Sequence, residues 1–186
     1  MFKYVRIVGI AFILAMVATP LVGPRPASAA SVAGIDRDVD AALRKLYDAM
    51  PEAEALAAKA KGILVFPNIV KAGFVVGAQY GEGALLKGGR TAGYYNIAAA
   101  SYGLQAGAQS FGYAMFFMTD SALNYLENSA GWEVGVGPSI VIVDTGMART
   151  LTTTTSQDDV YAFIFGQQGL MAGAGLQGSK ITKISP

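Results

Sequence analysis

Glycines recur at a four-residue spacing along much of this chain, and the residues between them are largely apolar. The positions that follow this spacing are Gly73, Gly77 and Gly81, then Gly103 and Gly107, Gly131 and Gly135, and Gly169 and Gly173. On a β-strand such positions lie on one face, where glycine lets another layer approach closely or lets the sheet bend. On a helix the spacing would favour membrane dimerisation, but glutamines and glutamates interrupt every stretch. The spacing therefore predicts a glycine-rich β-sheet.

Two amphipathic helices are expected before the sheet. Apolar side chains from Ile35 to Tyr47 recur at helical spacing, which predicts a helix over Ile35–Ala49. Pro51 can begin a second helix, and the alanine- and glutamate-rich Glu52–Ala60 continues it until Gly62 ends it. The expected fold class is α+β, with N-terminal helices packed on a twisted, mainly antiparallel, glycine-rich sheet that can curl toward a barrel.

The strands are read from short apolar runs between turn residues. The ranges expected as strands are Ile63–Phe66 (stopped by Pro67), Phe74–Gly81 and Leu85–Leu86 (a hairpin with its turn near Glu82–Gly83), Tyr94–Ile97, Gly103–Phe117, Glu133–Val143, Tyr161–Phe165 and Leu170–Leu176. Lys87–Arg90 is expected to be a turn, and Thr119 to cap a short helix over Asp120–Glu127. Trp132, the only tryptophan, is expected to be buried.

The first 29 residues have the three parts of a secretory signal peptide. Lys3 and Arg6 precede the apolar run Ile7–Val22, and Ala27–Ala29 is a small-x-small cleavage site. We expect cleavage after Ala29, with Ala30 as the alternative, an exported protein, periplasmic or extracellular, and one domain over residues 30–186. Loss of three basic residues leaves 11 against 13 acidic ones, a formal net charge of −2. Such a chain is a poor generic binder of nucleic acid.

The chain contains no histidine and no cysteine, which removes most familiar catalytic and metal-binding arrangements. Asp158 and Asp159 are adjacent, so on a strand they would point to opposite faces and make a poor acid/base pair. The glycine pair Gly81 and Gly83 lacks the remainder of a phosphate-binding loop. We therefore expect no enzyme, no cofactor, no metal site and no catalytic residue.

Several ordered sequence blocks resemble the SYLF lipid-binding domain family, whose yeast branch binds actin. The blocks are Ala60–Pro67, Lys71–Gly77, Tyr80–Gly83, Gly135–Pro138 and Gln168–Gly173, and the resemblance covers about Ala58 to Pro186. It implies a non-enzymatic binding module, with phosphoinositide membranes as ligands in eukaryotic members. This chain departs from the family pattern at Gly93–Ala98, and the acidic residues of its first helix differ from a basic membrane-binding helix.

The leading functional hypothesis is peripheral binding to anionic phospholipid or membrane surfaces. Its candidate residues are the basic side chains around the first strands, Lys59, Lys61, Lys71, Lys87 and Arg90. The first alternative is a structural or protein-interaction module of the envelope, with aromatic residues as its contact surface: Tyr94, Tyr95, Tyr102, Phe111 and Tyr113. The second is a small outer-membrane barrel. Actin binding, as in the yeast branch, is the less favoured reading for an exported protein.

Overall fold

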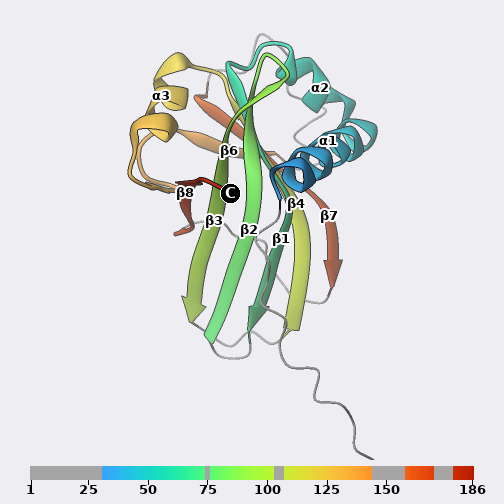
Figure 1. Ribbon diagram of the computed structural model, residues 1–186, viewed down its shortest axis with the longest axis vertical. Helices are drawn as coiled ribbons and strands as arrows, with labels where there is room; N and C mark the ends of the chain where they lie inside the picture. The colour runs from blue at the N-terminus through green and yellow to red at the C-terminus, as the bar shows by residue number, and fades with distance from the viewer. Residues whose placement is uncertain (1–30, 74–75, 103–106, 144–157, 170–177) are drawn as a thin grey trace, which may run out of the picture.

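The computed structural model describes residues 31–73, 76–102, 107–143, 158–169 and 178–186. The helices are α1 (Val32–Ala49), α2 (Pro51–Ala57) and α3 (Asp120–Asn128). The strands are β1 (Gly62–Gly73), β2 (Val76–Lys87), β3 (Arg90–Tyr102), β4 (Gly107–Phe117), β5 (Trp132–Glu133), β6 (Ile140–Val143), β7 (Val160–Gly169) and β8 (Lys180–Ile184). Figure 1 shows the three helices around the upper half of the molecule, while β1 to β4 extend below them.

The described strands form one sheet in the order β5-β8-β3-β2-β1-β4-β7-β6. Every neighbouring pair is antiparallel except β6 and β7, which run parallel. The sheet curls into a half-barrel, and helices cover part of it. The predicted α+β class, with N-terminal helices on a twisted and mainly antiparallel sheet, is confirmed.

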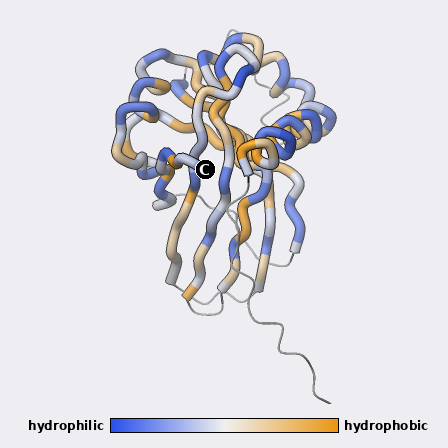
Figure 2. Tube along the Cα trace, viewed as in Figure 1, coloured by the Kyte–Doolittle hydropathy of each residue, from blue (hydrophilic) through white to orange (hydrophobic). Residues whose placement is uncertain are grey.

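Each face of the sheet has its own hydrophobic core. On one face, which we call the α1 face, α1 and α2 bury residues such as Val39 and Leu46 against Ala84, Leu86 and Phe116. On the other, the α3 face, α3 and β5 pack against alternate residues of the same strands. The strongly hydrophobic segments accordingly gather between the helices and the upper sheet (Figure 2). The upper half is therefore a three-layer structure.

The first strand does not stop at Pro67 as expected. β1 continues to Gly73, and its pairing with both neighbours shifts register between Val65 and Val70. Proline cannot donate a ladder hydrogen bond, but a bulge already interrupts the ladder there and accommodates it. The predicted turn near Glu82–Gly83 is likewise wrong, because β2 runs unbroken through both residues.

Glycine is needed in β2 because the bulge of β1 lies against it. A methyl group on Gly81 would lie 2.9 Å from the Asn68 carbonyl oxygen, and one on Gly83 would overlap the Val65 carbonyl oxygen. The glycines that suggested a turn therefore allow two backbones to approach closely.

Several local expectations hold. Gly88 and Gly89, with φ of 55° and 74°, make the turn between β2 and β3. The Thr119 hydroxyl accepts a hydrogen bond from the backbone N–H of Ala122 at the start of α3. The expected strand Glu133–Val143 is instead two strands, β5 and β6, because the backbone bends at Gly135 and Gly137, whose φ values are positive. The expected signal peptide over residues 1–29 and the expected strand Leu170–Leu176 lie outside the described residues.

Candidate functional site

The basic residues chosen from the sequence divide between the two ends of the sheet. Lys61, Lys87 and Arg90 share the upper end, where Lys87 pairs with Arg90 across the β2–β3 turn and Lys61 precedes β1. Lys59 is exposed beside them, just after α2. Lys71 pairs with Gln79 near the far end of β1, about 30 Å away at the usual rise of a strand. The structure thus brings four of the five basic residues to the upper end of the sheet.

Two of these upper lysines contact acidic side chains of α3. The Lys87 ammonium lies 2.6 Å from a carboxylate oxygen of Glu127, and the Lys61 ammonium lies 3.7 Å from Asp120. Both pairs join the strands to α3. The positive charge that these two residues offer to a ligand is therefore partly neutralised.

Asp159, the second of the two adjacent aspartates, has a structural role. Asp159 accepts hydrogen bonds from the Thr119 hydroxyl at 2.9 Å and from the backbone N–H and hydroxyl of Ser139 at 3.2 and 3.3 Å. The hydrogen bonds from Thr119 and Ser139 hold the pKa of Asp159 below its ordinary value. A carboxylate with these partners holds the start of α3 and the approach to β6 against β7.

The aromatic residues proposed as a contact surface lie mostly inside. Tyr95, Phe111 and Tyr113 are buried on the α3 face. The Tyr113 hydroxyl has no hydrogen-bond partner among the residues that the structure describes, and burial raises its pKa. The Tyr94 hydroxyl donates to Asp36 of α1, and the side chain of Tyr102 lies outside the described residues. These aromatic residues form no exposed patch among the described residues.

An exposed apolar surface exists elsewhere, on the α1 face below α1. We call it the lower sheet face. Its members lie across β3, β2, β1 and β4 and are joined by cross-strand pairing: Val70, Ala72, Val76, Ala78, Tyr80, Ala98, Ala100 and Ala108. All eight are exposed, with Val76 at 65% and both Val70 and Tyr80 at 48%. They share this face with Ala84 and Leu86, which α1 does cover higher up.

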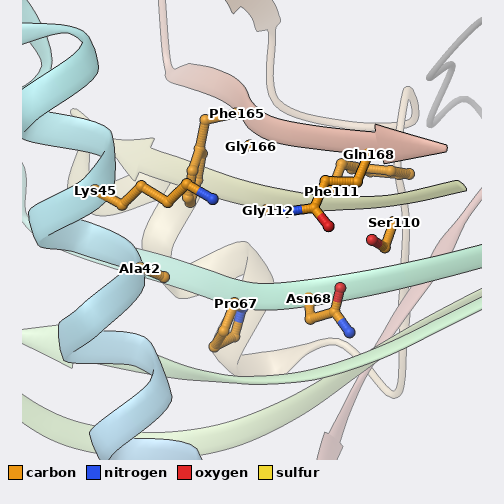
Figure 3. Close-up of a pocket in the computed structure, with 10 residues that line it drawn as sticks. All are labelled: Ala42, Lys45, Pro67, Asn68, Ser110, Phe111, Gly112, Phe165, Gly166 and Gln168. Atoms are coloured by element: carbon orange, nitrogen blue, oxygen red, sulfur yellow. The ribbon is translucent and has the colours of Figure 1, made fainter.

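A cavity of about 280 Å³ lies between α1 and the strands β1, β4 and β7. Its lining comprises Ala42, Lys45, Pro67, Asn68, Ser110, Phe111, Gly112, Phe165, Gly166 and Gln168. In Figure 3, Lys45 reaches from α1 toward Phe165 and Gly166, while Asn68 and Ser110 lie on the strand side. We call this the α1 cavity. Its polar lining consists of one ammonium, two amides and one hydroxyl.

Two apolar hollows adjoin the α1 cavity. One shares Ser110 and Gln168 with it and continues along Val70 and Ala108 on the lower sheet face. The other shares Phe165 and Gly166, has a volume of about 420 Å³, and is lined mainly by Met50, Ile142, Val143 and Ile164. The α1 cavity, with its polar lining, thus lies between two apolar hollows.

The described residues hold no group of acidic side chains suited to a metal ion. Among the helices of the described part, none is long and apolar enough to cross a membrane.

Sequence reasoning missed the α1 cavity and the lower sheet face. Lys45 belongs to the helix expected over Ile35–Ala49, and Asn68 follows the strand expected to stop at Pro67. The alternation of alanine and valine with glycine and glutamine in β2 does signal an apolar face (Val76, Ala78). It gives no sign that α1 leaves this part uncovered, because that depends on where the helix lies.

One comparison with known protein families gives a match. Residues 98–185 match the model of a family described as Ysc84, Las17-binding protein actin regulator. The matched range begins in β3 and continues through β8, so the glycine-rich blocks from Ala60 to Gly83 precede it. The chain matches no curated protein.

Proposed function

Because this chain belongs to the Ysc84 (SYLF) family, a family of binding domains rather than enzymes, we propose that it binds phospholipid membrane surfaces peripherally, anionic ones in particular. The observation that carries this proposal is the lower sheet face. Soluble proteins seldom expose a contiguous apolar surface, and where they do it commonly meets a membrane, a partner or a ligand.

The composition of the lower sheet face suits a lipid surface. Its eight members are alanines, valines and one tyrosine, and none is charged. The Tyr80 hydroxyl donates to Glu82 at 2.7 Å, so a polar group borders the apolar surface as at a membrane interface. Lys45 stands at the upper border, where a cation would meet lipid phosphates.

Vesicle co-sedimentation tests the proposal. We expect the purified protein to sediment with phosphatidylglycerol vesicles, more weakly with phosphatidylcholine vesicles, and less in high salt than in low salt. The double variant Val70→Glu/Ala78→Glu should lose most of this binding, because two carboxylates would enter the apolar surface. Both positions are exposed, so stability should change little.

The matched control makes the same substitutions on the exposed side of α1, Val32→Glu/Ala41→Glu, and should bind as the wild type does. A third variant, Lys61→Glu/Arg90→Glu, tests the upper basic residues separately. Equal sedimentation of the wild type and the lower-face variant would contradict the role of that face. Failure of the wild type to bind either vesicle would contradict the function, and capture of an envelope protein instead would favour a protein partner.

We further propose export of the chain, since its first 29 residues have the composition of a signal peptide. Expression in a bacterium that secretes proteins should yield a periplasmic form beginning at Ala30. Intact mass spectrometry of that fraction checks the cleavage site, and retention of the full-length mass would contradict it.

A further inference from the structure

We propose that the α1 cavity binds the phosphate of a single phospholipid headgroup, with Lys45 as its charged contact. This inference rests on the proposed membrane function and specifies which ligand atoms the protein recognises.

The α1 cavity is built into the strands that form it. The bulge at Pro67 and Asn68 interrupts β1, and the β4–β7 pairing shifts register between Ser110 and Gly112. On the β7 side of that shift, Gly166 adopts a φ of 61°. The two irregularities lie next to each other beneath α1, and they leave the space that regular strands would fill.

Gly166 makes room for the lysine. A methyl group on Gly166 would lie 2.8 Å from the Lys45 Nζ atom and 3.1 Å from its Cε atom. The ammonium therefore lies directly over the backbone of β7, at the inner end of a side chain that enters from α1 (Figure 3). The Lys45 side chain is exposed, and its ammonium lies next to Gly166 in this structure.

The polar groups of the α1 cavity have no partners within the described residues. Lys45 makes no ion pair there, whereas Lys61, Lys87 and Arg37 each contact a carboxylate. The side chains of Asn68, Ser110 and Gln168 likewise make no hydrogen bond within the described residues. No carboxylate lines the cavity. One cation with three neutral hydrogen-bonding side chains and no acid is a set that selects an anion rich in acceptor oxygens.

The surroundings favour a phospholipid over free phosphate. The α1 cavity is smaller than the usual site for a whole drug-sized molecule, so it suits a single small group. From it, the groove along Val70 and Ala108 leads onto the lower sheet face, where acyl chains would lie. A phosphate with apolar chains attached would fill both parts, while inorganic phosphate would fill only the first.

Titration with a short-chain lipid below its micelle concentration tests this. The probe is dihexanoyl phosphatidylglycerol, followed by calorimetry or by NMR shifts. We expect the wild type to bind it, Lys45→Gln to bind about tenfold more weakly through loss of one charged hydrogen bond, and Lys45→Arg to bind nearly normally. Lys183→Gln, a change at an exposed lysine on β8, is the matched control and should bind as the wild type does.

Inorganic phosphate is the second probe and should bind more weakly than the lipid. Equal lipid binding by Lys45→Gln and the wild type would overturn the proposal. Phosphate binding as tight as lipid binding would overturn the choice of a lipid. Vesicle binding by the wild type without short-chain lipid binding would refute this inference alone, whereas the reverse result would refute the proposed membrane function.

Discussion

Trp132 opens β5 with its indole ring enclosed between α3 and β4. The residue is 1% exposed, and its ring lies 5.8 Å from that of Phe117 and 6.4 Å from that of Tyr125. The indole N–H donates to the Val136 carbonyl at 2.8 Å, so the polar atom of the ring is also satisfied. A single residue thus joins the start of β5 to the core and fixes the following turn.

Replacing this ring is expected to be costly. Trp132→Ala should lower the free energy of unfolding by ~3–5 kcal/mol, because it leaves a large cavity in a packed core. Trp132→Phe should cost less, since most of the apolar area remains. Urea denaturation followed by circular dichroism measures both variants. An unchanged midpoint for Trp132→Ala would mean that the indole ring contributes nothing to the core.

Asp159 contributes stability that depends on pH. Folding lowers the pKa of Asp159 below its ordinary value of 3.8. The ionised carboxylate therefore stabilises the folded protein at pH values above 3.8, and this stabilisation is lost as the pH falls through the lowered pKa. Asp159→Asn should cost at most about 1 kcal/mol near pH 7, because the bonds from Thr119 and Ser139 are made to a charged group that solvent partly screens.

Melting temperatures of wild type and Asp159→Asn across the pH range check this. The difference should be largest near neutral pH and should shrink below about pH 4, where the wild-type carboxylate also takes up a proton. A difference that stays constant down to strongly acidic pH would show that charge plays no part.

The bulge of β1 and the glycines of the neighbouring strand β2 fit each other. The bulge brings the carbonyl oxygens of Val65 and Asn68 against β2, and only glycine at positions 83 and 81 leaves room for them. A substitution at either glycine therefore affects the register of two strands at once.

Gly83→Ala is expected to destabilise the protein by ~1–3 kcal/mol, as overpacking against backbone usually does. Gly93→Ala is the control, because a methyl group there would meet only the Tyr95 ring at 3.4 Å and the Lys183 side chain at 3.5 Å. Thermal unfolding of both variants gives the comparison. Equal melting temperatures would show that β1 can withdraw from β2 without cost.

The sequence predicts those helices, caps and turns that depend on residues close together in the chain. The helix over Ile35–Ala49, the cap at Thr119 and the turn at Gly88–Gly89 all follow from neighbours within a few residues. The continuation of β1 past Pro67 does not, because it depends on the bulge and on the glycines of another strand. Tertiary contacts there override the usual meaning of proline and glycine.

For the molecule as a whole, the sequence predicts the class of fold and the family, but the candidate site only in part. Of the basic residues chosen from the sequence, Lys61, Lys87 and Arg90 share one end of the sheet, whereas Lys71 lies toward the other. The α1 cavity could not be predicted, because its lining comes from α1, β1, β4 and β7. Nothing local in the sequence relates Lys45 to Ser110.

The partial cover that α1 gives to its face of the sheet also bears on how such a domain can diversify. Where the helices cover the sheet, a substitution in the core disturbs the packing of both the helix and the sheet. Selection there must conserve the volume and shape of the core side chains. Lower down, side chains such as Ala78 and Ala98 are exposed, and none of the described helices covers them. Substitutions of such exposed side chains disturb folding less, so relatives built on one scaffold could come to recognise unlike ligands.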